Sequence, residues 1–383
     1  CEVTLIDKNN FQTFLPLLYQ VSTAGLAADH IAYPIRSALR KSDIQFRMGT
    51  PISIDHKNKS IKIDSSEVFY FDYLVVALGS VTNDFGIPGV SQHALGMKSV
   101  QEALHIRSTI LRHFEDLCRF TDNSEMVINI IGGGPTGVEM AGAIAELRKG
   151  PLKLDLANAA EKIKVNIIEA GPRLLPSFSP SLSNKSKESL EKLGVNVKTS
   201  KSVKEIKARE IIYKDGSKLR SDLTIWTAGV SGEPTMKKLH LPSERGRISV
   251  ESTLQVTNYP YIFAIGDNAG FKDENGNNLP MVAPVAMQQG RFLAKQIKQL
   301  ENGLPTLKFK YRDKGSMATI GRHKAVVEVG KIKFSGIPAW YAWLWLHLFY
   351  LLGGRNKIGT MADWTWNYLT FDRSNRHIID IKE

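Results

Sequence analysis

A glycine-rich stretch at residues 132–137 has the composition of a loop that binds phosphate. It reads Gly-Gly-Gly-Pro-Thr-Gly, follows an apolar run at 127–131, and precedes a stretch of helical composition that extends to Leu147. A strand, a glycine turn and a helix in this order let the backbone approach a pyrophosphate, which lies at the helix N-terminus where free N–H groups favour negative charge. The residues predicted to form this cradle are Gly132, Gly134 and Gly137. A turn without a ligand is the alternative, because glycine-rich turns also arise by chance.

An acidic residue follows the next apolar run, residues 165–168. Glu169 is placed to accept hydrogen bonds from ribose hydroxyls, and its charge repels a 2′-phosphate. The pattern therefore predicts a site for NADH rather than for NADPH. The distance in sequence from the glycine loop to Glu169 exceeds the usual ~20 residues. We expect the charged, alanine-rich residues 148–164 to extend the helix and account for the excess.

The first seven residues resemble the second half of such a unit. They form an apolar run that ends in Asp7, as the later run ends in Glu169, and nothing precedes them in the sequence. Because a complete βαβ unit takes about 30 residues, we expect roughly 20 to 30 residues with the first strand, glycine loop and helix to be missing. A first residue Cys1 rather than Met agrees with an N-terminally truncated chain.

An internal repeat supports the pairing of these two acid-ended runs. Residues 72–79, Asp-Tyr-Leu-Val-Val-Ala-Leu-Gly, match residues 222–229, Asp-Leu-Thr-Ile-Trp-Thr-Ala-Gly. A repeat of this kind predicts an α/β fold with two Rossmann-like nucleotide-binding domains. A further apolar run at 261–265 ends in Gly266 and Asp267, and the alternative for this pattern is an ordinary turn.

Positive charge and aromatic side chains are concentrated near the C-terminus. The chain has a formal net charge of +12, and residues 308–333 contain eight Lys or Arg against two acids. Residues 337–352 are apolar and uncharged apart from His347. As a helix they would reach about 24 Å, less than the ~30 Å hydrocarbon core of a bilayer, so we expect them to lie in a membrane interface. A buried core helix or a dimer interface is the alternative.

The chain has two cysteines, Cys1 and Cys118, and no CxxC pair. Two distant cysteines predict neither a disulfide framework nor a zinc site, and a reducing compartment is the simplest interpretation. The basic residues border an aromatic run rather than a recognition motif, which argues against nucleic-acid binding.

Taken together, these stretches resemble the type II NADH dehydrogenases, the single-subunit NADH:quinone oxidoreductases that pump no protons. The resemblance covers nearly the whole chain and rests on residues 3–10, 14–20, 85–90, 132–139, 168–176, 225–230, 264–267, 318–322 and 366–372. It implies bound FAD, NADH as electron donor and a membrane quinone as acceptor. The implied fold is that of the disulfide reductases, with two FAD/NAD(P)-binding domains and a C-terminal amphipathic helical segment that anchors the protein to a membrane.

The resemblance also implies roles for individual residues. The residues implied to bind FAD are Asp7, Gly79, Gly266 and Asp267. Those implied to bind NADH are Gly132, Gly134, Gly137, Glu169, Ala228 and Gly229. Glu139 matches an acid close to the point where nicotinamide meets flavin, although an acid there can also simply complement the helix dipole. Gln288 and Gln289 lie in the stretch that matches the quinone end, where Pro284 replaces a family glutamine and leaves the quinone preference open.

Domain bounds and partners follow from the same resemblance. We expect residues 1–100 and 250–305 to form the FAD-binding domain, residues 101–249 the NADH-binding domain, and residues 306–383 a C-terminal segment for membrane contact and dimerisation. Residues 308–371 are expected to meet an anionic membrane surface, in a homodimer on the cytoplasmic face of a bacterial-type inner membrane. Without the first glycine loop, we expect this chain to retain FAD poorly and to be an impaired enzyme.

Two other functions compete with this interpretation. A sulfide:quinone oxidoreductase shares the fold, but its chemistry needs cysteines beside the flavin, and the positions of Cys1 and Cys118 do not match that need. A non-catalytic, NADH-responsive membrane scaffold would explain the missing glycine loop. Asp7, Gly79 and Asp267 argue against the scaffold, because they have no use without a flavin.

Overall fold

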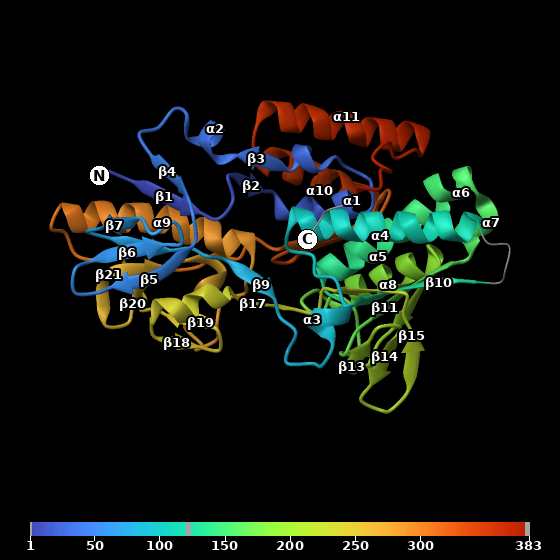
Figure 1. The fold of residues 1–383 in the computed structure, drawn as a ribbon, viewed down its shortest axis with the longest axis horizontal. Coiled ribbons are helices and arrows are strands. Elements are labelled where there is room, and N and C mark those ends of the chain that lie inside the picture. Colours follow the sequence, from blue (N-terminus) through green and yellow to red (C-terminus); the bar gives the residue numbers. More distant parts are fainter. Residues whose placement is uncertain (1, 120–123, 380–383) are drawn as a thin grey trace. The chain divides into compact units, whose positions relative to one another are not determined.

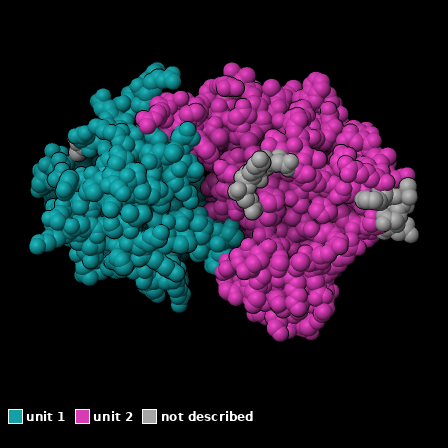
Figure 2. All heavy atoms as spheres, viewed as in Figure 1, with its two compact units in different colours: residues 1–10, 39–83, 230–314 teal, residues 11–38, 84–229, 315–383 magenta. Residues whose placement is uncertain are grey.

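The computed structural model describes residues 2–119 and 124–379, which divide into two compact units (Figures 1 and 2). Unit 1 comprises residues 1–10, 39–83 and 230–314, and unit 2 comprises residues 11–38, 84–229 and 315–383. Cys1, the start of the expected first strand, lies outside the described residues. The bounds of the units differ from those of the expected domains. In particular, the C-terminal segment belongs to the same unit as the glycine loop. The cofactor of each unit stays a prediction.

Unit 1 consists of short strands and one long helix. Its elements are β1 (Thr4–Asp7), β4 (Gln45–Met48), β5 (Pro51–Asp55), β6 (Ser60–Ile63), β7 (Val68–Tyr70), β8 (Leu74–Val76), β9 (Ser80–Thr82), β17 (Val230–Gly232), η3 (Pro234–Leu239), β18 (Ser243–Glu244), β19 (Arg247–Ser249), β20 (Gln255–Val256), β21 (Tyr259–Ala264), η4 (Gly266–Asn268), β22 (Ala269–Gly270) and α9 (Ala283–Glu301). β1 pairs in parallel with β4, and β8 pairs in parallel with β21. Because Val76 lies opposite Ala264, the carboxyl ends of β8 and β21 meet at one edge of their sheet.

Unit 2 is built on a parallel sheet covered by helices. Its strands are β2 (Phe11–Thr13), β3 (Ala32–Pro34), β10 (Met126–Ile131), β11 (Ile163–Ile168), β12 (Val195–Lys198), β13 (Val203–Lys207), β14 (Glu210–Tyr213), β15 (Lys218–Arg220), β16 (Leu223–Trp226), β23 (Ser316–Gly321), β24 (Lys324–Val329) and β25 (Ile332–Ser335). Its helices are η1 (Leu15–Leu17), α1 (Leu18–Ser22), η2 (Ala28–His30), α3 (Val90–His93), α4 (Val100–Arg119), α5 (Pro135–Lys149), α6 (Pro151–Asp155), α7 (Ala157–Glu161), α8 (Pro180–Lys192), α10 (Ile337–Tyr350) and α11 (Gly354–Thr370), while α2 (Ile35–Leu39) ends at the boundary of the units.

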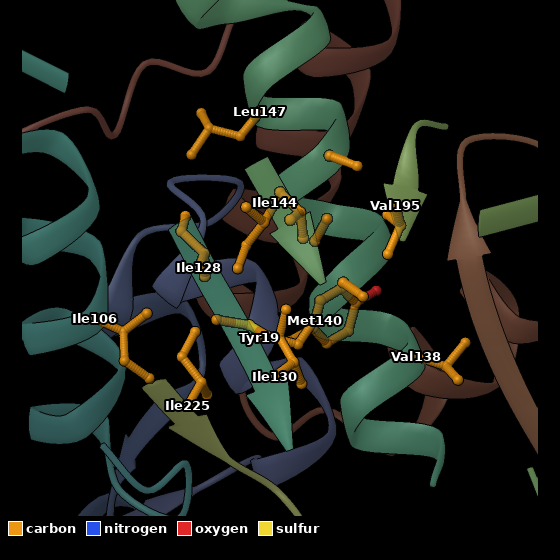
Figure 3. Close-up of a cluster of buried hydrophobic side chains, with 14 of the residues drawn as sticks. Tyr19, Ile106, Ile128, Ile130, Val138, Met140, Ile144, Leu147, Val195 and Ile225 are labelled. Atoms are coloured by element: carbon orange, nitrogen blue, oxygen red, sulfur yellow. The ribbon is translucent and has the colours of Figure 1, made fainter. Parts of the chain in front are cut away.

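The central sheet of unit 2 has the strand order β12-β11-β10-β16, all parallel. Strands buried on both faces need nearly continuous apolar sequence, which β10 and β11 supply. Ile128 and Ile130 of β10 pack against Met140 and Ile144 of α5, and Figure 3 shows Tyr19 in the same cluster. The expected strand, glycine loop, helix and acid-ended strand are therefore confirmed as secondary structure.

The expected extension of the helix through residues 148–164 is wrong. Helix α5 ends at Lys149, and two short helices, α6 and α7, follow before β11 begins. Pro151 explains the break, because proline has no N–H for the helical hydrogen bond and its ring clashes with the preceding turn. The excess length between the glycine loop and Glu169 is therefore taken up by these two short helices.

Three asparagines form a ladder across the parallel sheet. Asn129, Asn166 and Asn196 are register partners on β10, β11 and β12. The Asn166 amide donates to Asn129 Oδ1 at 2.7 Å, and the Asn196 amide donates to Asn166 Oδ1 at 3.0 Å. Asn129 itself donates to the Arg220 carbonyl at 3.0 Å. Because a slip of one residue would separate all these amides, the ladder specifies the strand register.

We expect Asn166→Val to destabilise the protein by about 2 to 4 kcal/mol, because it leaves the Asn129 acceptor and the Asn196 donor without partners. Urea unfolding measures the change. Asn196→Val is the matched control, since it removes one hydrogen bond at the exposed end of the ladder and should cost about half as much. Equal stability of Asn166→Val and the parent protein would contradict a role for the ladder.

The C-terminal segment forms a three-stranded antiparallel sheet, β23-β24-β25, followed by α10 and α11. The expected helix in the aromatic run is confirmed as α10. Ala339 and Trp340 of α10 pack against Ala325 and Val327 of β24. Within residues 2–119 and 124–379, no helix has the length and apolar character needed to cross a bilayer.

Strand β23 packs directly on helix α5 of the same unit. A Cβ atom built on Gly142 would lie 2.0 Å from the carbonyl oxygen of Ile320, so only glycine allows this approach. Two acids on the same face of α5 accept backbone hydrogen bonds from this part of the chain, Glu139 from Thr319 and Glu146 from Arg322. Glu146 also pairs with the guanidinium of Arg373 at 3.5 Å. The C-terminal segment is therefore held by the helix that follows the glycine loop.

A histidine pairs with helix α11. His30 Nδ1 lies 2.9 Å from a carboxylate oxygen of Asp363, and the same oxygen accepts the backbone N–H of Ala27. The hydrogen bond to Asp363 raises the pKa of His30, burial opposes the rise, and the charges of Asp29 and Arg355 have smaller, opposite effects. When His30 is protonated, its ion pair with Asp363 should therefore stabilise the attachment of α11.

We expect His30→Gln to lower the melting temperature at pH 6 and to have little effect at pH 9. Since the folded pKa of His30 lies above its unfolded value of about 6.5, the stabilisation is complete below that value and is lost as pH rises through the folded pKa. The expected loss at pH 6 is about 1 kcal/mol. Calorimetry at both pH values measures it, with the exposed His93→Gln as control. An equal loss at both pH values would contradict the ion pair.

Candidate functional site

The three glycines expected to form the cradle, Gly132, Gly134 and Gly137, differ in what surrounds them. A Cβ on Gly132 would lie 2.7 Å from the Ala228 backbone, and one on Gly137 would lie 1.9 Å from the Gly132 carbonyl oxygen. A Cβ on Gly134 would meet no atom within 4 Å. In a dinucleotide-binding loop the first glycine makes the turn, the second leaves space for the pyrophosphate and the third allows helix and strand to pack closely. The surroundings of these glycines fit that division.

The N-terminus of α5 begins at this loop, and no side chain caps it. Its first backbone N–H groups have no partner within the helix, and the helix dipole favours an anion there. Open space above Gly134 and uncapped donors at the start of α5 together fit the pyrophosphate of a dinucleotide.

Glu169 stands at the carboxyl end of β11, as the sequence predicts. Its carboxylate accepts the Gly133 N–H and the Gly171 N–H, both at 2.6 Å. These bonds fix the carboxylate beside the glycine loop and leave further lone pairs on each oxygen. A ribose whose pyrophosphate lies at Gly134 can therefore donate its hydroxyls to Glu169.

Ala228 and Gly229 follow β16 and lie on the other side of the loop. The Thr227 hydroxyl before them donates to the Ile131 carbonyl at 2.9 Å. A Cβ on Gly229 would lie 2.6 Å from the Phe85 ring. The structure thus brings together all six residues expected to bind NADH. Ala228 is exposed, so a ligand can reach this side of the loop.

In unit 1, three of the four residues expected to bind FAD come together. Gly79 follows β8, and Gly266 and Asp267 follow β21. Ser80 Oγ donates to Asp267 at 2.5 Å, and the Gly79 N–H donates to the Asn268 side chain at 3.2 Å. Gly79 has φ +76°, and a Cβ there would meet nothing within 4 Å. A fixed carboxylate beside open backbone fits the hydroxyl-bearing portion of a flavin nucleotide.

Asp7 is the fourth residue expected to bind FAD. It ends β1, and its carboxylate accepts the Asn9 N–H at 2.7 Å while its backbone carbonyl accepts the Gly49 N–H. This is the strand-end position that Glu169 occupies in unit 2. A role for Asp7 at a ribose stays a prediction.

Gln288 and Gln289 lie in helix α9 of unit 1 and have different surroundings. Gln288 makes two hydrogen bonds to the backbone of Arg312. Gln289 is completely buried, and its Oε1 accepts the Gly266 N–H at 2.7 Å. Gln289 therefore supports the loop that carries Asp267. Direct contact of either glutamine with a quinone stays a prediction.

Glu139 faces the C-terminal segment from helix α5. Burial raises the pKa of Glu139 to about 8, while the hydrogen bond from the Thr319 N–H and the nearby Trp343 indole have smaller, opposite effects. The carboxyl group is therefore protonated at neutral pH. The raised pKa argues against an acid that only complements the helix dipole, because that interpretation needs a charged carboxylate. The role of Glu139 stays a prediction.

Glu139 lines a cavity of about 290 Å³ within unit 2. Aromatic side chains form much of the wall, namely Tyr19, Trp340, Trp343, Trp364, Tyr368 and Phe371. Charged groups, among them Glu146, Arg322 and Arg373, line it as well. A cavity with aromatic walls and a few polar groups is typical of a site for a small planar molecule.

Several residues of these sites were not expected from the sequence. Ser80 and Asn268 orient the loops of unit 1, and Tyr19 and Thr319 lie close to Glu139 in unit 2. Ser80 and Asn268 carried a local signal, since they directly follow Gly79 and Asp267. Thr319 contacts a helix 180 positions earlier in the chain, and no local pattern reports such a contact.

The described residues contain no group of three or more His, Cys, Asp or Glu that could hold a metal ion. Cys118 lies in α4, partly buried, and burial raises the pKa of its thiol. A thiol of this kind is less reactive than an ordinary cysteine. Cys118 therefore gives no support to the sulfide:quinone alternative.

Comparison with known families agrees with both parts of the chain. Residues 1–290 match the family described as pyridine nucleotide-disulphide oxidoreductase, and residues 314–373 match the NDH2 C-terminal domain. A type II NADH:quinone oxidoreductase of Mycobacterium tuberculosis is 34% identical, over 99% of this chain and 85% of that protein. One from Staphylococcus aureus is 33% identical, over 85% of this chain and 82% of its own length.

Solved structures share the fold. NDH2 from Plasmodium falciparum in complex with NADH superposes with a TM-score of 0.88 at 22% identity, over 99% of this chain and 95% of that one. The sulfide:quinone oxidoreductase of Aquifex aeolicus gives 0.75 at 17% identity, over 96% and 89%. At these identities the structures show the α/β fold alone, whereas the sequence relatives and both family matches distinguish the alternatives. The chain belongs to the type II NADH:quinone oxidoreductase family.

Proposed function

We propose that this protein oxidises NADH and, through FAD, reduces a membrane quinone without pumping protons. The observation that carries the proposal is the glycine loop, where Gly134 leaves open space, Glu169 is fixed beside it, and the helix N-terminus is uncapped. Family membership supports the same activity. The scaffold alternative has no comparable support, because the residues of unit 1 expected to bind FAD are held in place by hydrogen bonds.

The residues of unit 2 would bind and orient the nucleotide. The N–H groups at the start of α5 would hold the pyrophosphate, and Glu169 would accept the ribose hydroxyls. Ala228 and Gly229 would border the nicotinamide. The negative charge of Glu169 would exclude a ribose that carries a phosphate, which is the basis for preferring NADH.

The residues of unit 1 fit the flavin nucleotide. Asp267, held by Ser80, would accept ribityl hydroxyls, Gly79 would leave room for the flavin, and Asp7 would accept the adenosine ribose. When bound, FAD supplies a ring that takes a hydride from the nicotinamide and returns two electrons to the quinone. The part of the protein is to hold the reacting groups close together and to exclude water.

The cavity of unit 2 is our candidate for the quinone. Its aromatic walls suit a planar ring, and quinone reduction consumes protons that Glu139 can supply, because its raised pKa keeps it protonated near neutral pH. Gln288 and Gln289 belong to unit 1, and their direct contact with a quinone is a proposal separate from this cavity. Pro284 cannot make the side-chain hydrogen bond of the glutamine it replaces.

The C-terminal helices would contact the membrane surface. Tyr341, Trp345 and Phe349 of α10 are 61%, 72% and 60% exposed and follow one another at helical spacing. Aromatic side chains favour the headgroup region, and Lys or Arg within residues 308–371 would meet anionic lipids. We propose a peripheral protein on the cytoplasmic face of the inner membrane, with part of the same surface used in a homodimer.

NADH oxidation by the FAD-loaded protein with a short-tailed benzoquinone tests the function. We expect quinone reduction with NADH and a kcat/KM at least tenfold lower with NADPH, which corresponds to about 1.4 kcal/mol. The variant Glu169→Gln, which removes the charge and keeps the shape, should lose most of this preference. Failure to couple NADH oxidation to quinone reduction, or a preference for NADPH, would overturn the proposal.

A further inference from the structure

Three polar side chains form a hydrogen-bonded chain along the cavity of unit 2. The indole N–H of Trp364 donates to Oε1 of Gln20 at 2.7 Å. The Gln20 amide nitrogen donates to the hydroxyl oxygen of Tyr19 at 2.9 Å. All three residues line the cavity together with Glu139. The chain thus runs from α11 to the short helix α1, within one unit.

The direction of these bonds is fixed by chemistry. An indole nitrogen can only donate, so the Gln20 atom beside Trp364 must be the oxygen. The other end of the amide is then the nitrogen, which donates to Tyr19. The Tyr19 hydroxyl accepts this bond, and its own proton must point elsewhere. Trp364 therefore determines, through Gln20, that Tyr19 acts as a donor.

Among the described residues, Gln20 is the one hydrogen-bond partner of the Tyr19 hydroxyl. Tyr19 is only 5% exposed, and its ring packs edge-on against Trp343, 6.1 Å between centroids. Burial raises the pKa of Tyr19 well above its usual value, so the hydroxyl keeps its proton. A buried donor without an acceptor costs free energy that a bound acceptor would recover.

We propose that the Tyr19 hydroxyl donates a hydrogen bond to a carbonyl oxygen of the quinone in this cavity, and that Gln20 and Trp364 position it. This inference rests on the proposed function. A quinone offers carbonyl acceptors in the plane of a flat, conjugated ring, which can stack between aromatic side chains and accept a hydrogen bond from a donor among them. The protonated Glu139 is a second donor to the same cavity, so two donors serve one acceptor molecule.

The variant Tyr19→Phe tests the contact, because it removes one oxygen atom and keeps the ring. In the FAD-loaded protein we expect the KM for a short-tailed benzoquinone to rise about 5- to 20-fold, the range for one buried hydrogen bond. The KM for NADH and the rate with ferricyanide, which bears no carbonyl, should stay unchanged. Tyr213→Phe is the matched control, since Tyr213 is also buried and its hydroxyl has no hydrogen-bond partner among the described residues.

The variant Trp364→Phe tests the positioning. It removes the indole donor, so the Gln20 amide is free to reverse and accept the Tyr19 proton. We expect the KM for the benzoquinone to rise about 3- to 10-fold, with no further rise when Trp364→Phe is combined with Tyr19→Phe. Thermal unfolding separates this effect from a loss of fold.

The outcomes separate this inference from the proposed function. If the parent protein does not reduce benzoquinone with NADH, the proposed function itself is wrong. If the parent protein reduces it and Tyr19→Phe leaves the quinone KM unchanged, the Tyr19 contact is wrong while the function stands. A loss of ferricyanide rate equal to the loss of quinone rate would also overturn the contact, because it would point to a general defect.

Discussion

Replacing Gly137 with alanine will weaken NADH binding strongly and lower the melting temperature. The new Cβ would lie 1.9 Å from the Gly132 carbonyl oxygen and 2.8 Å from Thr227 Oγ1, distances that no packed structure allows. The first turn of α5 must then move away from β10, at a cost of about 1 to 3 kcal/mol in stability. The donors at the start of α5 move with it, so we expect the NADH affinity to fall roughly 100-fold. Calorimetric titration with NADH and thermal unfolding measure the two effects.

Two other glycine variants act as controls. Gly134→Ala places its methyl group in open space with a φ of −71° that alanine tolerates, so it should fold normally. It should still weaken NADH binding, by about tenfold, because the methyl group occupies space needed by the pyrophosphate. Gly290→Ala in α9 should change neither property. Tight NADH binding by Gly137→Ala would contradict the role of the close contact.

The second large effect is expected at Glu139. We expect Glu139→Gln to lower kcat for quinone reduction about 100-fold at pH 7, because glutamine has the shape of the protonated acid but no proton to transfer. The parent activity should fall as pH rises through about 8, where the carboxyl group ionises. The variant should lack this transition. Steady-state rates with NADH and benzoquinone between pH 6 and 9.5 measure both.

Stability gives an independent check on the same carboxyl group. Its folded pKa of about 8 exceeds the ordinary value of 4.5, so its contribution is complete below pH 4.5 and is lost as pH rises to 8. Glu139→Gln should therefore gain roughly 3 kcal/mol over the parent protein between pH 5 and pH 8.5, in urea unfolding. Glu188→Gln, an exposed change of the same kind on α8, should gain nothing. A parallel pH profile for parent and variant would rule out the raised pKa.

The sequence predicted the elements that depend on local pattern. Strand β10, the glycine loop, α5 and Glu169 at the end of β11 were all placed correctly, because apolar runs, glycines and an acid identify them residue by residue. Pro151 is a signal in the sequence for the end of α5. The expectation of a continuous helix passed over it, because the composition of the neighbouring residues favours a helix. Local propensity was given more weight than the missing N–H of proline.

Contacts between distant segments could not be predicted. Asn166 interrupts an apolar strand and looks unfavourable until its register partners Asn129 and Asn196 are known. The raised pKa of Glu139 depends on burial by a segment that begins about 175 residues later. In the same way, Trp364 controls the Tyr19 hydroxyl through a chain that no spacing rule connects. These features depend on tertiary packing, which one sequence without relatives does not report.

The close packing of β23 on α5 restricts which parts of this protein can be exchanged with those of its relatives in a chimaera. Residues 314–373 match a family domain of their own, and such boundaries suggest a cassette that can be exchanged. A substituted C-terminal domain could approach α5 this closely only if the helix has glycine at position 142. Its backbone N–H groups would also need the acceptors Glu139 and Glu146. A chimaera that exchanges only the cassette between relatives would thus carry a mismatched interface into the nucleotide module. The C-terminal domain and the residues of α5 that contact it must therefore be exchanged together.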